Sequence, residues 1–269
     1  DHGGGVWSSY YSNYAFVTNV NGYWQTAYCS LKGRLRMAVS EEEQTAAPAQ
    51  GVLWEYNPAV SSKGEIAFLT KRFGNVDLLA ADTEGRLRVI SRTPENESNP
   101  VWSEDGARIA FVRYSTGSNN GQLIVADKYG KNSKAVSPSI SGDMVPAWSP
   151  DGKQLAVNIN GSGDKKGLWL VNSDGSGWRK ISDKGGGKVA AWSSDGKMIA
   201  FTDNLGQLYV WDATTETADS QSLIKVEPVD QKGSVEYVAW APKSRQLLLE
   251  WKGEQTKTKA VWRAEVIKF

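Results

Sequence analysis

The sequence has one histidine and one cysteine in 269 residues, and both shortages exclude several kinds of chemistry. Cys29 cannot form a disulfide within the chain, so thiols say nothing about the redox compartment. His2 lies beside the beginning of the chain, where mobile residues are common. We therefore expect neither a histidine-based metal site nor a Ser-His-Asp triad within this chain, and we predict no metal and no cofactor.

Long apolar runs and an excess of one charge are also lacking. No run approaches the roughly 18 apolar residues that a membrane-spanning helix needs. The 31 basic and 30 acidic residues leave a net charge of +1, which gives no electrostatic reason to expect nucleic acid. The chain starts with Asp1, from which we expect a mature or excised segment, with any membrane anchor outside it; a trimmed expression product is the alternative.

One phrase recurs along the chain and is the main signal of the fold. Its clear copies are PVWSEDGARIAF at 100–111, PAWSPDGKQLAV at 146–157 and AAWSSDGKMIAF at 190–201. The tryptophans of these copies and of a looser one lie 46, 44 and 48 residues apart, at Trp102, Trp148, Trp192 and Trp240. Short β-rich runs and Gly, Asn and Asp turns follow each copy, so each repeat is predicted to contain four strands. This period is typical of propeller blades, and no helical periodicity supports a helical repeat.

We predict an all-β fold, a six-bladed β-propeller of four-stranded antiparallel blades in one domain over residues 1–269. The blades are expected near residues 5–40, 52–92, 97–137, 143–182, 187–226 and 234–269. The first repeat keeps Trp7 but lacks the Asp-Gly turn. The last repeat is long enough for three strands but leaves too few residues for a regular fourth. The ring is expected to close through Gly3–Val6 or through sequence outside this chain. Residues 41–56 form a linker in which Val52–Trp54 begin the next strand.

The three clear phrases, with LWLVNSDGSGWRKIS at 168–182, resemble the WD40-like (PD40) repeat of TolB-type six-bladed β-propellers over about residues 57–250. The resemblance implies an extracytoplasmic bacterial location and protein partners, with ligands meeting one mouth of the central channel. It leaves the function open, because such blades occur in periplasmic scaffolds, peptidase gating domains, a few lyases and sensor or lipoprotein modules.

The fold itself accounts for most of the unusual residues. The repeat tryptophans, together with Trp169 and Trp211, are expected to pack between sheets, whereas Trp178 is expected to be partly exposed. Aspartates before glycine favour hairpin turns over a carboxylate ring for a cation or for acid-base chemistry; they are Asp105, Asp151 and Asp195. KGGGK at 184–188 lacks the context of a phosphate loop and is interpreted as a flexible loop between blades. Asn96-Glu97-Ser98 matches the glycosylation tripeptide, a match that carries no meaning in a bacterial protein.

Candidate binding residues lie in loops predicted at one end of the blades. There the loops between second and third strands meet the connections between blades. The loops at 113–121 and 158–167 are longer than hairpins require, which indicates recognition. Arginine and aromatic residues are the usual anchors of protein interfaces. The predicted partner-binding residues are Arg72, Phe73, Arg113, Tyr114, Asp143, Lys165, Lys166, Lys188, Glu236 and Tyr237.

We therefore predict a monomeric, non-catalytic binding or scaffold propeller in the periplasm or at the cell surface. It recognises a protein or peptide partner at one mouth of the channel, and a rigid ring limits the backbone entropy lost on binding. One alternative is a sensor or ligand-binding domain of a membrane-attached signalling protein or lipoprotein. Another is a propeller lyase or hydrolase, which the histidine count disfavours. No nucleic-acid partner is expected.

Overall fold

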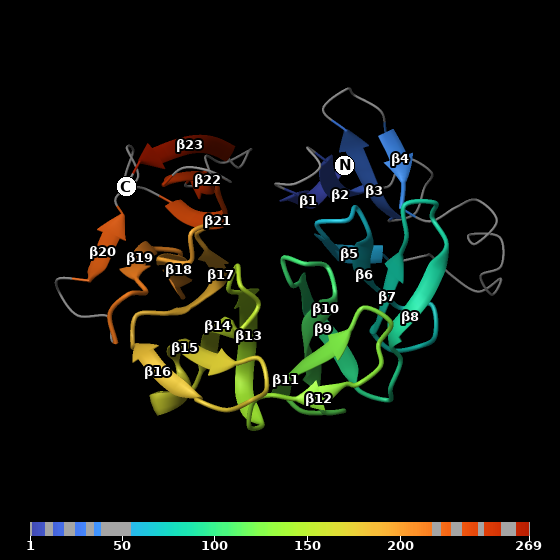
Figure 1. Ribbon diagram of the computed structural model, residues 1–269, viewed down its shortest axis with the longest axis horizontal. Helices are drawn as coiled ribbons and strands as arrows, with labels where there is room; N and C mark the ends of the chain where they lie inside the picture. Colours follow the sequence, from blue (N-terminus) through green and yellow to red (C-terminus); the bar gives the residue numbers. More distant parts are fainter. Residues whose placement is uncertain are drawn as a thin grey trace. The chain divides into compact units, whose positions relative to one another are not determined.

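A computed structural model describes residues 2–8, 13–18, 25–30, 35–38, 55–216, 222–226, 233–241, 245–253 and 262–268. The chain divides into two compact units, Asp1–Ala135 and Val136–Phe269. In each unit antiparallel strands follow one another in chain order (Figure 1). Within the described residues the only helical element is the short 3-10 turn η1, Gly163–Lys165. None of the described segments forms a helix with the length and apolar character of a membrane crossing.

The first unit holds three antiparallel groups of four strands. The first group is β1 (His2–Ser8), β2 (Asn13–Thr18), β3 (Gln25–Ser30) and β4 (Leu35–Met37). The second group is β5 (Glu55–Val60), β6 (Ile66–Thr70), β7 (Asp77–Ala81) and β8 (Leu87–Ser91). The third group is β9 (Asn96–Trp102), β10 (Arg108–Tyr114), β11 (Asn120–Asp127) and β12 (Lys134–Ala135).

The second unit continues the same pattern. Its first group is β13 (Ile140–Trp148), β14 (Gln154–Gly161), β15 (Gly167–Asn172) and β16 (Arg179–Ser182). Its second group is β17 (Gly186–Trp192), β18 (Met198–Asp203), β19 (Leu208–Asp212) and β20 (Leu223–Val226). Its last group has three strands among the described residues, namely β21 (Gly233–Trp240), β22 (Gln246–Gly253) and β23 (Trp262–Lys268).

These groups confirm the predicted all-β fold of four-stranded antiparallel sheets. The strand runs expected after the clear phrases correspond to β10 through β12 and to β14 through β16. The predicted start of a strand at Val52–Trp54 lies outside the described residues, as does most of the linker at 41–56. Closure of the groups into one six-bladed ring, in a single domain, stays a prediction.

Serine and aspartate side chains build the turns between first and second strands. In the β9–β10 turn the Ser103 hydroxyl donates to Asp105 Oδ1 at 2.6 Å, and the Ala107 N–H donates to the same oxygen at 2.9 Å. Gly106 follows with φ of 64°, a conformation that glycine adopts without strain. The same bonds recur at Asp151 and Asp195. The Ser103 hydrogen bond, above all, holds the pKa of Asp105 below its usual range, and the interpretation of these aspartates as turn formers is confirmed.

Replacing Asp151 by alanine should lower the free energy of unfolding by about 0.5 to 1.5 kcal/mol at pH 7, because two hydrogen bonds of the turn are lost. The Lys153 N–H is the main cause that lowers the pKa of Asp151. The contribution of this carboxylate is therefore present above its unfolded pKa and is lost as the pH falls through its folded pKa. Urea unfolding at several pH values measures this difference. Asp143→Ala, at an exposed carboxylate, is the control and should show little change.

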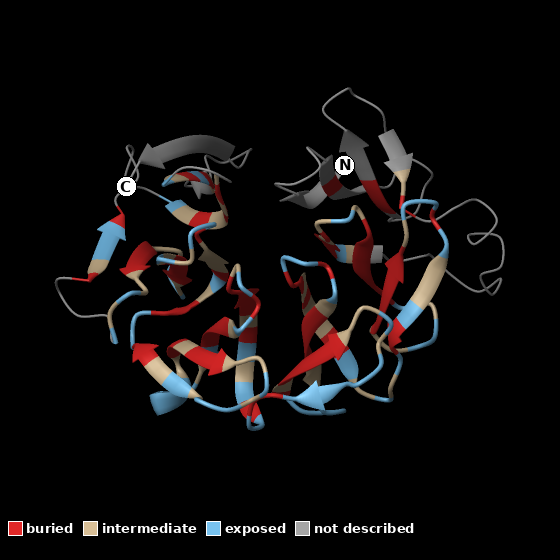
Figure 2. Ribbon diagram, viewed as in Figure 1, coloured by how far each residue is buried: buried red, intermediate tan, exposed pale blue. Residues whose placement is uncertain are grey.

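Tryptophan side chains join neighbouring sheets inside each unit. Trp102 is buried, and its Nε1 donates to the carbonyl of Ala59 in the preceding sheet at 3.1 Å. Trp240 makes the equivalent bond to the carbonyl of Ala191 at 3.1 Å. Both rings belong to clusters of buried apolar side chains. Figure 2 shows the buried residues concentrated on strands such as β6 and β7, whereas β12 is exposed. The predicted packing between sheets is confirmed for these two rings, and Trp211 is fully buried as expected.

Trp169 and Trp178 form a different arrangement. Their rings stack with centroids 5.5 Å apart and an interplanar angle of 21°. Both residues are half-buried, as predicted for Trp178. Trp169 was expected in the core, and this prediction is wrong because its ring packs on Trp178 while its Nε1 donates to the carbonyl of Lys165 at 3.0 Å.

The glycines of the 184–188 segment lie in close contact with neighbouring backbone, so their interpretation as a flexible loop is wrong. Gly185 and Gly186 are buried, and Gly186 already begins β17. A Cβ atom on Gly187 would lie 2.2 Å from the carbonyl oxygen of Asp203, and one on Gly185 would lie 2.6 Å from the carbonyl carbon of Gly167. Only residues without a Cβ permit this approach of the chain.

Asn158, on β14, holds this glycine segment in place. The Asn158 side chain is fully buried. Its Oδ1 accepts from the Gly186 N–H at 2.7 Å. Its Nδ2 lies within 3.2 Å of three carbonyl oxygens, those of Gly187, Val189 and Thr202. One amide side chain therefore connects β14 to both β17 and β18.

Candidate functional site

The loop end of the first unit is the end that carries residues 71–76, 92–95 and 115–119. Side chains connect these three segments. Asn75 Nδ2 donates to the carbonyl of Thr93 at 2.7 Å, and the Thr116 hydroxyl donates to the carbonyl of Pro94 at 3.0 Å. The loop end of this unit is therefore one connected surface rather than three separate loops.

An aromatic ring and a guanidinium group meet on this surface. Phe73 lies between β6 and β7, and 37% of its surface is exposed. The Arg92 guanidinium carbon lies 4.0 Å from the centroid of the Phe73 ring, in cation–π contact. Arg72 is half-buried beside Phe73, and its N–H donates to the Thr70 hydroxyl at 3.3 Å. The pair of Phe73 and Arg92 exposes both an apolar ring and a positive charge.

The side chain of Arg113 contacts a buried glutamate, Glu97. Glu97 lies on β9 and is 2% exposed. Its Oε1 accepts from the hydroxyls of Ser91 at 2.7 Å and Thr93 at 3.0 Å, and Arg113 Nε lies 3.4 Å away. Arg113 Nη2 also donates to the Ser91 hydroxyl at 2.9 Å. Tyr114 follows at the end of β10 and is half-buried. The network fixes the direction of the Arg113 side chain.

A second buried carboxylate lies close to Glu97. Asp77 begins β7 and is fully buried. Among the described residues no donor meets hydrogen-bond geometry at Oε2 of Glu97 or at the Asp77 carboxylate, although the Thr93 backbone amide lies near Asp77. Burial raises the pKa of Asp77, against the charge of Arg92 and the backbone amide of Thr93. Burial also raises the pKa of Glu97, and the charge of Asp77 adds to that rise.

The loop end of the second unit carries residues 162–166, 183–185 and 204–207. Lys166 Nζ donates to Asn204 Oδ1 at 2.8 Å. Lys188 Nζ pairs with Glu236 Oε2 at 2.9 Å, and the Ser234 hydroxyl donates to the other oxygen of Glu236 at 2.6 Å. Of the other predicted residues in this unit, Lys165 and Asp143 are exposed, and Tyr237 is half-buried.

The structure thus brings the predicted residues together in two sets, one in each unit. Arg72, Phe73, Arg113 and Tyr114 lie at the loop end of the first unit, and Lys188 pairs with Glu236 in the second unit. Whether both sets line one channel mouth stays a prediction. Sequence reasoning missed Arg92 and the buried carboxylates Asp77 and Glu97.

The side-chain chemistry at the loop end of the first unit is aromatic and cationic. Within the part of the chain that the structure describes, no three or more His, Cys, Asp or Glu side chains form a group that could hold a metal ion. The exposed groups are an aromatic ring and guanidinium groups, which serve as anchors in protein interfaces.

Comparisons with known proteins agree with this architecture. The family model described as the TolB beta propeller domain matches residues 60–256, more than half of the chain. A Tol-Pal system protein TolB of Francisella tularensis subsp. holarctica is 31% identical over 177 residues, which cover 62% of this chain and 39% of that protein. The chain therefore spans well under half of that relative.

Solved structures show the same fold at low identity. The crystal structure of TolB from Acinetobacter baumannii has a TM-score of 0.60 at 17% identity, over 91% of this chain and 62% of that chain. A prolyl endopeptidase structure has a TM-score of 0.67 at 14% identity, over 99% of this chain and 41% of that chain. At these identities the likeness concerns the fold alone.

Proposed function

Because the chain belongs to the TolB beta propeller domain family, we propose that it is a non-catalytic, extracytoplasmic binding domain for a protein or peptide partner. The observation that carries the proposal is the pair of Phe73 and Arg92 at the loop end of the first unit, next to the fixed Arg113. Relatives named as Tol-Pal system proteins support a role within a protein assembly of the cell envelope. A fixed surface of this kind binds with little loss of side-chain entropy.

The test begins with the purified chain immobilised and exposed to an extract of the native cell envelope. A captured protein is identified, purified and titrated against the chain. Phe73→Ala and Arg92→Ala should each weaken binding by about tenfold or more, since each removes a central anchor. Lys153→Gln, whose side chain is 81% exposed in a turn of the second unit, is the control and should leave binding unchanged.

Equal affinities of all three variants and the parent chain would show that the loop end of the first unit is not part of the interface. Capture of a small molecule with no protein would overturn the proposal as a whole. Reproducible turnover of peptide or polysaccharide substrates by the purified chain would overturn its non-catalytic part. Thermal unfolding of each variant shows whether a loss of binding reflects a loss of folding.

A further inference from the structure

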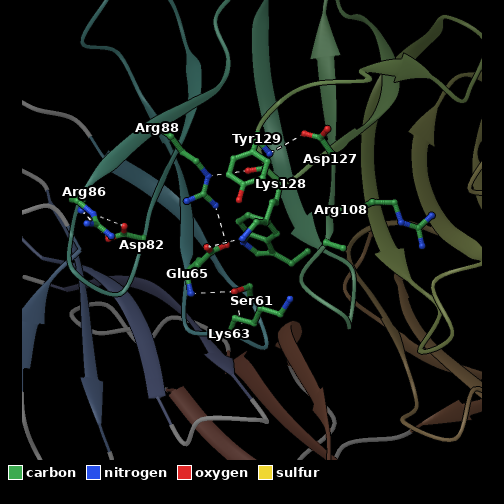
Figure 3. A network of polar contacts seen from close by, with 12 residues as sticks. Ser61, Lys63, Glu65, Asp82, Arg86, Arg88, Arg108, Asp127, Lys128 and Tyr129 are labelled. Carbon is green, nitrogen blue, oxygen red and sulfur yellow. Dashed lines mark hydrogen bonds and ion pairs between the residues drawn. The ribbon is translucent and has the colours of Figure 1, made fainter.

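The opposite end of the same sheets carries a second cluster of charged and aromatic side chains (Figure 3). At its centre the Glu65 carboxylate lies between two cations. Arg88 Nη2 is 2.9 Å from Glu65 Oε2, and Lys128 Nζ is 3.5 Å from Glu65 Oε1. The side chain of Glu65 is 12% exposed, and those of Arg88 and Lys128 are 20% and 27% exposed. One carboxylate therefore faces two cations, which leaves one positive charge in excess.

Tyr129 covers this cluster but remains largely open to solvent. Its exposed fraction is 59%. Lys128 Nζ lies 4.9 Å from the centroid of its ring, and the Arg88 guanidinium carbon lies 5.9 Å from it. Figure 3 shows the ring beside both cations, above Glu65. Most of the Tyr129 ring therefore stays exposed although it contacts two cations.

The turn that carries Tyr129 is fixed on β8. Arg88 Nε donates to the carbonyl of Lys128 at 2.8 Å. A Cβ atom on Gly130 would lie 2.1 Å from the carbonyl oxygen of Ile90, so the turn backbone lies directly against that strand. Asp127 Oδ1 accepts from the Tyr129 N–H at 2.9 Å. These contacts hold the turn through its backbone, and none of them involves the Tyr129 ring.

We propose that Tyr129, Arg88 and Lys128 form a second interaction surface, which binds an acidic peptide segment of a protein partner. A carboxylate of that segment contacts the exposed parts of the two cations, and an adjacent apolar side chain packs on the Tyr129 ring. The Asp127 carboxylate keeps its own charge, but its oxygens accept from the N–H groups of Tyr129 and Lys131 and from the Asn132 side chain, which hold it within its own turn. Tyrosine and arginine are enriched among the residues that dominate interface energies.

The test uses a fluorescent acetylated heptapeptide in which glutamates surround one phenylalanine, titrated into the full chain by fluorescence anisotropy. Tyr129→Ala and Lys128→Gln should each weaken binding by about fivefold or more, and added salt should weaken it further. The matched peptide with glutamine in place of glutamate should bind much more weakly. Phe73→Ala should leave the affinity unchanged, because Phe73 lies at the opposite end of the same sheets. Lys153→Gln, which removes one largely exposed cation from another turn, should also leave it unchanged.

Three results would overturn the proposal. The first is an equal affinity of the glutamine peptide, which removes the role of charge. The second is an equal affinity of the Tyr129→Ala and Lys128→Gln variants, with their thermal unfolding unchanged. The third is a loss of binding in Phe73→Ala alone, which moves the acidic peptide to the loop end. Retention of binding by both control variants together with its loss in both test variants supports the proposal.

Discussion

Replacing Asn158 by leucine is expected to lower the free energy of unfolding by about 3 to 4 kcal/mol, as measured by urea unfolding. Leucine has a similar size but no polar atoms. The buried Gly186 N–H would lose its partner, and the carbonyls of Gly187, Val189 and Thr202 would lose the two N–H groups of the amide that they share. Each buried polar group left without a partner costs about 1 to 3 kcal/mol, and other bonds of the sheet offset part of the sum.

Asn160→Ala is the matched control for this substitution. Asn160 lies two residues further along β14 but is exposed, so its removal should change the free energy of unfolding by no more than about 0.5 kcal/mol. A second variant, Asn158→Asp, keeps the acceptor for Gly186 and removes the donor to the three carbonyls. It should also destabilise the chain strongly. Equal stabilities of the leucine variant and the Asn160→Ala control would show that the amide network does not hold the glycine segment.

Replacing Asp77 by asparagine is expected to act in the opposite direction at neutral pH. The Asp77 carboxylate is fully buried, and the Arg92 charge and the Thr93 backbone amide do not offset that burial, so its charge is costly in the folded state. The neutral amide of similar shape should raise the free energy of unfolding by about 1 to 2 kcal/mol at pH 7. Glu97→Gln should raise the free energy of unfolding by less, because the substitution weakens or removes the three contacts that the Glu97 carboxylate makes.

The pH dependence of the difference distinguishes this cause from a change in packing. The folded-state pKa of Asp77 is raised, mainly by burial. Below its unfolded pKa of about 3.9, the contribution of Asp77 to the free energy of unfolding is therefore complete. That contribution is lost as the pH rises through the raised folded pKa of Asp77. The stability advantage of Asp77→Asn should thus be small near pH 4 and should grow toward pH 7. Asp143→Asn, at an exposed carboxylate, is the matched control for the change from carboxylate to amide. An advantage independent of pH would contradict the electrostatic cause.

The repeat pattern was enough to predict the sheets and most turns. Trp102 and Asp105 follow local rules, since a strand with a large ring and an Asp-Gly turn favour the same register in each repeat. The failures are long-range contacts. KGGGK has the composition of a flexible loop, and only the approach of β14, with Asn158, requires its glycines. The sequence spacing between Asn158 and Gly186 carries no periodic signal that indicates this contact.

The candidate site was predicted in part for the same reason. Arginine and aromatic residues in long loops indicated Phe73 and Arg113, and the structure places them at one loop end of the first unit. Glu97 was noted only within a glycosylation tripeptide, and Asp77 was not singled out. Their importance comes from burial beside each other, which depends on how β7 packs against β9. A charged residue at the start of a strand is more often exposed, so composition alone favours the wrong environment.

The bond from Trp102 to the carbonyl of Ala59, repeated from Trp240 to Ala191, also bears on how such a chain can change through evolution. The acceptor is a main-chain oxygen, which every amino acid supplies. The hydrogen bond itself therefore constrains only the indole donor, whereas burial limits the size of the side chain at Ala59. Neighbouring repeats can therefore differ widely in sequence and keep the same hydrogen bond between their sheets, because its acceptor is a main-chain atom.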